Sequence, residues 1–356
     1  MKKTQMDKFL TRFEIIRFLL AIIVAFAVTF ILLLFFADAP LKAMIDILIG
    51  PLTSVRRFST VIEAMIPLTF SGLAITVLFR SGQFNLAAEG SLYMGGLVAA
   101  MVAIFSPFPP LISIIIAIIL AGFAGIIITA IPGYLKIKVG TSVLVISLML
   151  NTVVLYFGTF LFNMFLRDPN SAYASSYVFR TGNTLMKIIP KTRLHSGFIV
   201  MILFVILTTI FLNKTKWGYK ISLTGRNKNN ANFVGINVPG MIMLSQCVGG
   251  FIAGIGGGIE MLGLYTRFQW MALPGYGFDG VVLNIIARDQ PILIPFAAFI
   301  VSYIRVGADY MYRQTNVASE IVAIIEGIVI ILIVAEGFLY KWKHKKTVEI
   351  SMREEV

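Results

Sequence analysis

Acidic residues inside apolar stretches are the first sign of chemistry in this sequence, because an ionised carboxylate at membrane depth is costly and needs a reason. Four such residues are Glu89, Glu260, Asp279 and Glu326. Each could cap the end of a broken helix or bind a buried backbone group. Alternatively, each could line a polar path through a membrane, and the sequence favours this interpretation most for Glu89.

The residues before Glu89 strengthen that interpretation. The stretch 80–96 starts with polar and glycine residues and continues as an apolar helix. Asn85 can cap this helix, and Glu89 lies one turn further along on a similar face. The pattern is typical of a broken helix beside a translocation path, or of a helix start that other parts of the protein cover.

Several other chemistries lack their residues. The chain has no Gly-Lys dipeptide, and therefore no Walker A phosphate loop, and it has no Gly-x-Ser-x-Gly elbow. His195 and His344 are the only histidines, Cys247 is the only cysteine, and no cluster of them has metal-ligand spacing. We therefore expect a transport or structural protein with no metal, rather than an enzyme.

The composition indicates an integral membrane protein. Of 356 residues, 58% are hydrophobic and 13% are charged, whereas an average soluble domain has about 25% charged residues. The net charge of +13 is better explained by basic loops that face anionic lipid than by nucleic-acid binding.

Ten apolar segments are candidates for transmembrane helices of an all-α bundle. They are 15–37, 59–79, 84–105, 109–131, 141–163, 197–213, 240–263, 275–287, 291–306 and 317–340. The first is expected to be a retained anchor rather than a cleaved signal. The eighth is too short to span alone and follows a stretch rich in Gly and Pro, which predicts a broken or re-entrant helix.

Lysine and arginine positions predict the orientation. With both termini inside, 19 of these residues lie in cytoplasmic segments and 11 outside. This predicts a cytoplasmic N-terminus (1–14), one transmembrane domain (15–340) and a basic cytoplasmic tail (341–356). The basic loop 164–196 is then extracytoplasmic, either as a docking surface or as one loop that escapes the bias.

Two segments have distinct patterns. The cytoplasmic segment 213–238 has five basic residues and no acid, and a short helix over 227–234 that ends at Gly235 is expected. This segment is either a basic loop at the lipid surface or a docking helix for a cytoplasmic protein. In the span 240–263, glycines recur every four residues at Gly250, Gly254 and Gly258, which predicts close helix packing rather than chemistry.

Four motifs, in order, resemble those of ABC-importer permeases of the nucleoside and simple-sugar group, which is related to the branched-chain amino-acid permeases. The first, Gly82-x-Phe-Asn-Leu-x-x-Glu-Gly90, resembles the signature Phe-Asn-Ile-Gly-x-Glu-Gly. The others are a cytoplasmic segment with Gly218, Lys220, Gly225-x-Asn227, Ala231 and Gly235-Ile236, a Gly/Ala-rich span Gly249–Gly263 with Glu260, and Gly277-Phe278-Asp279-Gly280. Ala87, Ser222 and Asn230 depart from the group's usual Gly, Arg and Ala.

The resemblance implies a multi-pass permease subunit of a bacterial plasma membrane, which forms the path for nucleosides. It implies a second permease subunit, usually a different chain, and an extracytoplasmic substrate-binding lipoprotein. It also implies a cytoplasmic ATPase that binds the ATP, so no cofactor is expected on this chain. Membrane lipid is the other expected partner, and nucleic acid is not expected.

The resemblance also implies roles for residues. Phe84, Asn85 and Glu89 would lie at the substrate path, with Asn151 and Trp270 as further candidates, since an aromatic ring can stack on a base and amides can bind its edges. The residues expected to couple to the ATPase are Gly218, Lys220, Gly225, Arg226, Asn227, Ala231 and Gly235.

Three alternatives stay open at this point. The chain could be a permease for a pentose or another simple sugar. It could be a secondary transporter driven by an ion gradient, although no internal repeat supports this. It could also be a structural or assembly protein, in which case neutralising Glu89 would affect stability alone.

Overall fold

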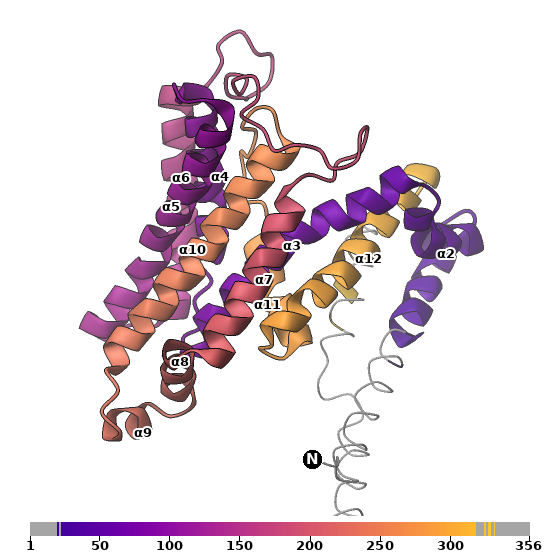
Figure 1. Ribbon diagram of the computed structural model, residues 1–356. Helices are drawn as coiled ribbons and strands as arrows, with labels where there is room; N and C mark the ends of the chain where they lie inside the picture. The colour runs from indigo at the N-terminus through magenta and orange to yellow at the C-terminus, as the bar shows by residue number, and fades with distance from the viewer. Residues whose placement is uncertain (1–19, 21–22, 318–323, 325–326, 329–330, 332–356) are drawn as a thin grey trace, which may run out of the picture. The chain divides into compact units, whose positions relative to one another are not determined.

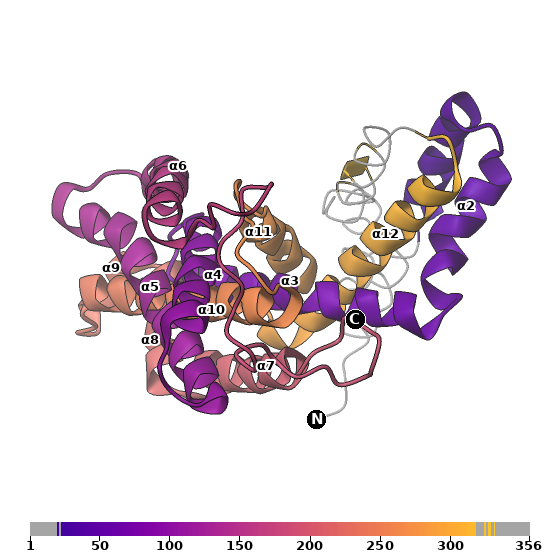
Figure 2. The same cartoon turned by 90° about the horizontal axis from the view of Figure 1, so that it is seen from above.

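The structure is a computed structural model that describes residues 20, 23–317, 324, 327, 328 and 331. Packing divides the chain into two compact units, Ser54–Ser302 and Met1–Thr53 with Tyr303–Val356. The described residues form helices and no β-strand, apart from two isolated bridges between loop residues, as Figures 1 and 2 show. The expected all-α class is confirmed.

The larger unit, as far as it is described, contains nine α-helices and the start of a tenth. They are α3 (Val55–Arg80), α4 (Ala88–Phe105), α5 (Pro110–Val139), α6 (Val143–Leu161), α7 (Gly197–Lys214), α8 (Lys216–Arg226), α9 (Lys228–Phe233), α10 (Val238–Leu264), α11 (Tyr276–Ala287) and the first residues of α12 (Ile294–Gln314). A π-helical turn, Phe162–Leu166, extends α6.

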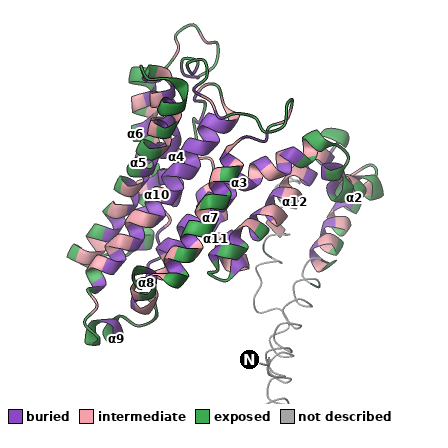
Figure 3. Cartoon of the chain, viewed as in Figure 1, coloured by how far each residue is buried: buried purple, intermediate pink, exposed green. Residues whose placement is uncertain are grey.

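The helix α10 lies at the centre of this unit, where it packs against α3, α4 and α5. Figure 3 shows α10 and α4 mostly buried, while α5, α6 and α7 each keep an exposed stripe. Glycines make the close approach between α10 and its neighbours. A Cβ atom on Gly250 would meet the Thr129 hydroxyl, one on Gly254 would meet the Ala121 carbonyl, and one on Gly258 would lie 2.9 Å from the Ala121 Cβ.

The smaller unit, as far as it is described, contains an apolar helix over Ile23–Phe36, α2 (Pro40–Ile49) and the end of α12. The glycines at 50 and 307 let α2 and α12 approach closely, since a Cβ on Gly50 would meet the Tyr310 ring. The Tyr303 hydroxyl donates to the carbonyl of Leu48 at the end of α2.

Seven helices of the described residues are long and apolar enough to cross a membrane. They correspond in order to seven of the ten predicted segments. The predicted segment 275–287 is α11, which has 12 residues and is too short to span, as expected. The start of 15–37 (residues 15–19, 21 and 22), most of 317–340 and all of the tail 341–356 lie outside the described residues, so the total of ten and the orientation stay predictions.

The loop between α6 and α7 has little regular structure, and backbone hydrogen bonds hold it to the end of α10 and to the segment that follows α10. Ser176 N donates to Phe268 O (3.0 Å), Phe179 N to Thr266 O (2.9 Å) and Leu185 N to Leu262 O (2.8 Å). The loop therefore covers the end of the bundle where α3 begins and α10 ends, which is the predicted extracytoplasmic end.

Candidate functional site

Glu89 and the start of α11 form a cap between two helices. Glu89 lies in the first turn of α4 and is fully buried. Its Oε1 accepts a hydrogen bond from the Gly275 N–H (2.6 Å), and its Oε2 accepts one from the Gly277 N–H. Free N–H groups at a helix start favour a negative charge. Glu89 thus binds buried backbone groups, which is the first of its two predicted roles. Its two partners are 186 and 188 residues away in the sequence.

The start of α4 is capped in the same way by another helix. Asn151 lies in α6, and its Oδ1 accepts from the Gly90 N–H (3.0 Å) while its Nδ2 donates to Leu86 O (3.0 Å). Ser147 Oγ accepts from the Leu86 N–H (3.0 Å). The two broken helices α4 and α11 therefore both begin at polar side chains supplied by a neighbour.

Asn85 does not cap α4, which corrects the sequence prediction. The helix begins later, with Ala87 in the N-cap position and no side-chain cap there. Asn85 Oδ1 accepts from the Ala87 N–H (2.8 Å), and its Nδ2 donates to Gln246 Oε1 (2.6 Å) and Thr129 O (3.2 Å). Asn85 thus ties the extended segment before α4 to α5 and α10. Sequence reasoning missed Gln246, although an amide in an apolar span is a visible signal.

Two aromatic candidates differ in exposure. Trp270 is 8% exposed and packs edge-on against Tyr265 and Phe268, with Gly96 directly beside its ring. Phe84 is 63% exposed and packs against Phe79, with 4.8 Å between the ring centroids. Among the five path candidates, Asn85, Glu89 and Asn151 gather around the start of α4, Trp270 lies beside its middle, and Phe84 is the exposed one.

The segment 213–238 forms two short helices rather than one. The predicted helix is α9, whose N-cap Asn227 accepts from the Asn230 N–H (3.1 Å) and whose end is followed by Gly235 at φ +77°. The helix α8 was missed because its glycines, Gly218 and Gly225, are poor helix formers. Thr215 caps α8 by accepting from the Gly218 N–H (3.1 Å).

The glycines of α8 make close contact with the bundle. A Cβ atom on Gly218 would meet backbone carbonyls at the end of α7, and one on Gly225 would meet the carbonyl of Arg80. Ala231 is buried, while Arg226 and Asn227 are exposed. The Lys220 ammonium lies 5.6 Å from the centre of the Trp217 ring, within cation–π range.

Large apolar side chains of α8 and α9 remain exposed. We use "α8–α9 surface" for this set: Trp217 (53% exposed), Tyr219 (67%), Phe233 (96%) and Val234 (67%). An exposed apolar group flanked by basic residues is typical of a protein or membrane contact. Sequence reasoning named the glycines and polar residues of this segment but not these side chains.

Arg80, at the end of α3, connects α8 to the bundle. Its guanidinium donates to Ser222 Oγ (3.1 Å), Asn213 Oδ1 (3.2 Å) and Asp289 O (3.0 Å). Asp289 follows α11, and its carboxylate accepts from Asn284 Nδ2 (2.7 Å). Ser222 stands at a position where the permease group usually has arginine. In this chain its hydroxyl accepts a hydrogen bond from Arg80, an arginine of another helix.

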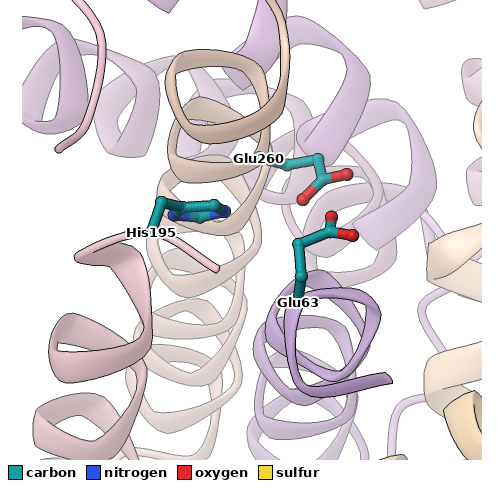
Figure 4. A group of neighbouring side chains, drawn as sticks. All are labelled: Glu63, His195 and Glu260. Carbon is teal, nitrogen blue, oxygen red and sulfur yellow. The ribbon is translucent and has the colours of Figure 1, made fainter. Parts of the chain in front are cut away.

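The other intramembrane acids have different surroundings. Glu260 is fully buried, and its Oε1 accepts from the Tyr276 hydroxyl (3.3 Å). Asp279 lies in the first turn of α11, where a negative charge is favoured. Glu326 lies outside the described residues. Glu260 also lies close to Glu63 and His195 (Figure 4), the one group of metal-ligand side chains found among the described residues.

Comparison with known proteins identifies the family. The nucleoside ABC transporter permease protein NupB of Lactococcus lactis is 28% identical over 94% of this chain and 96% of its own length. The guanosine ABC transporter permease protein NupP of Bacillus subtilis is 29% identical over 79% and 81%. The glucose ABC transporter permease protein TsgB13 of Haloferax volcanii is 25% identical over 91% and 88%.

No solved structure matches the chain. The relatives are membrane transport subunits and not enzymes, in agreement with the expected class. The family profile described as the permease component of branched-chain amino acid transport systems matches residues 57–334. The chain is thus an integral membrane protein and belongs to this family of ABC transporter permeases.

Proposed function

We propose that this chain is the permease subunit of an ATP-driven importer and forms the path for nucleosides that an extracytoplasmic binding protein delivers. The observation that carries the substrate class is the similarity, over most of the chain, to a nucleoside permease and a guanosine permease. In this proposal the chain has ten spans with both termini inside and forms one permease domain, and a second permease chain completes the path.

The substrate path in this proposal runs past the starts of α4 and α11. Phe84 is the residue with free ring surface there, and stacking on a base is a contact that an exposed aromatic side chain offers. Asn85, Glu89 and Asn151 hold the two helix starts through internal hydrogen bonds. We assign them to the shape of the path rather than to direct substrate contact, and Trp270 to packing behind it.

The α8–α9 surface is the proposed docking site for the cytoplasmic ATPase. It combines exposed apolar side chains with basic ones, and it is joined to α3, α7 and the α11 turn through Arg80. Such a connection can transmit movement of the ATPase to the helices of the path, provided that the ATP-bound and ATP-free forms of the ATPase bind this surface differently. ATP would be bound by the partner and not by this chain.

Uptake of labelled purine and pyrimidine nucleosides tests the proposal, in cells that lack this chain and in the same cells complemented with it. We expect uptake to be lost and restored, without competition from unlabelled pentoses or glucose. Unchanged nucleoside uptake in the deleted cells, with no redundant system present, would overturn the nucleoside assignment.

A sugar is the second candidate substrate, since the relative from Haloferax volcanii is a glucose permease. Loss of labelled glucose or pentose uptake in the same deleted cells, with nucleoside uptake intact, would select it. An ion-coupled secondary transporter is disfavoured by the family and would show as uptake that survives depletion of ATP.

A further inference from the structure

Three side chains from distant parts of the sequence meet at the end of the bundle covered by the loop between α6 and α7 (residues 167–196, the 167–196 loop). Glu63 lies in α3, His195 precedes α7, and Glu260 lies near the end of α10. Each has one ligand atom within 4.8 Å of those of the other two. Figure 4 shows the two carboxylates facing each other and the imidazole directed toward them from the side.

These groups are buried, and two of their ligand atoms lack hydrogen-bond partners. Glu63 is 3% exposed, and His195 and Glu260 are fully buried. His195 Nε2 and Glu260 Oε2 have no hydrogen-bond partner. A buried polar atom without a partner is unusual, and two in one small cluster indicate that something is bound between them.

No lysine or arginine of the described residues forms an ion pair with either carboxylate. Lys187 and Arg193 act electrostatically on the two carboxylates from a distance, and the Lys187 ammonium donates to the carbonyls of Gly263 (2.6 Å) and Arg193 (3.3 Å) instead. Two buried carboxylates without a paired cation are strongly unfavourable. A bound cation would balance the negative charge of the two carboxylates and would give His195 Nε2 and Glu260 Oε2 a partner.

The ligand set selects the kind of cation. Imidazole nitrogen and carboxylate oxygen are both zinc ligands, whereas calcium and magnesium prefer oxygen ligands alone. We propose that Glu63, His195 and Glu260 form a binding site for a divalent cation of the zinc class. The Tyr276 hydroxyl donates to Glu260 Oε1 (3.3 Å) and so helps to hold this ligand in place.

The state of the histidine is compatible with this role. Burial, and then the charge of Lys187, lower the pKa of His195 to about 4, so the ring is neutral near pH 7. Its Nδ1 accepts from the Gly197 N–H at 3.2 Å, which places the ring proton on Nε2 in the free protein. Coordination through Nε2 requires the neutral tautomer with its proton on Nδ1, so metal binding would replace the hydrogen bond from Gly197.

The consequence of such a site is a fixed connection between three elements. Through His195 the metal would fasten the 167–196 loop to α3 and α10, the two helices that pack on each other in the core. The role is structural, and it does not depend on which substrate the permease moves.

Zinc content of the full-length chain, purified with its partners in detergent, tests this site. The affinity tag must contain no histidine. The background protein carries Cys247→Ser and His344→Ala, which remove the only cysteine and the only other histidine. In this background we expect about one zinc per chain to remain after desalting, because structural zinc sites bind tightly.

Glu63→Gln and Glu260→Gln each keep the size of the side chain and remove a ligand, and we expect each to weaken zinc binding at least about tenfold. Asp168→Asn is the matched control, since it neutralises a carboxylate that pairs with Arg267 (3.0 Å) rather than with the cluster, and it should keep the zinc. Co²⁺, used as a probe in place of zinc, should give a visible absorption band, and His195→Gln should abolish it. If Glu63→Gln or Glu260→Gln fails to purify as a single species, His195→Gln takes its place in the test.

The proposal is overturned if the background protein holds no zinc, or if all ligand variants bind zinc as the background protein does. Both results are independent of transport. A chain that holds zinc yet moves no nucleoside would support the site and count against the proposed substrate, so the two proposals fail separately.

Discussion

The guanidinium of Arg80 donates to the hydroxyl of Ser222 at 3.1 Å and thereby joins the end of α3 to the middle of α8. The same guanidinium also binds Asn213 at the end of α7 and the carbonyl of Asp289 after α11. One side chain therefore holds four separate elements at the base of the bundle. Movement of the α8–α9 surface would reach the bundle through this contact.

Arg80→Ala removes all these bonds, and we expect uptake to fall about tenfold while ATP hydrolysis by the purified complex continues. A hydrogen bond to a charged group contributes roughly 1.5–3 kcal/mol, and 1.4 kcal/mol corresponds to about a tenfold change. Ser222→Ala removes one bond of the set and should have a smaller effect. The quantity to measure is substrate moved per ATP hydrolysed; an unchanged ratio in Arg80→Ala would contradict this role.

Glu89→Ala leaves the N–H groups of Gly275 and Gly277 without their acceptor. We expect the free energy of unfolding to fall by about 2 kcal/mol, the usual range for a buried donor that loses its partner being about 1–3 kcal/mol. Glu89→Gln keeps one acceptor oxygen and should lose less. Thermal unfolding of the purified protein measures both, and equal stability of wild type and Glu89→Ala would show that the cap is unimportant.

Uptake by Glu89→Gln separates the two roles of this residue. The variant should keep nearly normal membrane abundance, and reduced uptake would then mean that the negative charge between α4 and α11 matters for the path. Normal uptake would assign Glu89 to stability alone.

Much of the fold was predictable, because long apolar runs specify membrane helices through composition alone. The segments 59–79, 109–131 and 240–263 appear as α3, α5 and α10, with ends shifted by one to eight residues. The break before α11 was also visible, since Gly and Pro at 274–277 interrupt an apolar run. Local signals of this kind act within one or two helical turns.

The site was less predictable, because its contacts are not local. The sequence marks Glu89 as unusual, but its partners are Gly275 and Gly277, and no spacing rule connects them. The helix α4 begins at Ala88 and not near Asn85, because Asn151 of α6 supplies an acceptor for its first turn. Glu63 and Glu260 likewise meet His195 only through the packing of three elements.

Gly225→Ala tests the close approach between α8 and the end of α3. The added methyl group would collide with the carbonyl of Arg80, a backbone atom that cannot turn away. We expect α8 to shift, with uptake falling and ATP hydrolysis continuing, and Asn227→Ala should act in the same direction by removing the cap of α9.

Gly235→Ala is the control for this experiment. Gly235 has a positive φ but nothing within 4 Å of its added Cβ, so the substitution tests backbone strain without a collision. Comparable uptake defects in Gly225→Ala and Gly235→Ala would contradict the collision argument, because only one of the two changes displaces α8.

Phe233→Ser tests whether the α8–α9 surface binds the ATPase. Phe233 is 96% exposed, so its removal takes away no packing within the chain and should leave thermal stability unchanged. An aromatic side chain at the centre of a protein interface often contributes 2 kcal/mol or more, roughly a thirtyfold change in affinity. We therefore expect much less ATPase to copurify with this variant.

Tyr173→Ser is the control. It removes an 85% exposed aromatic side chain from the loop at the other end of the bundle, and it should copurify with the ATPase normally. Equal recovery of the ATPase with both variants would place its docking site elsewhere on the chain.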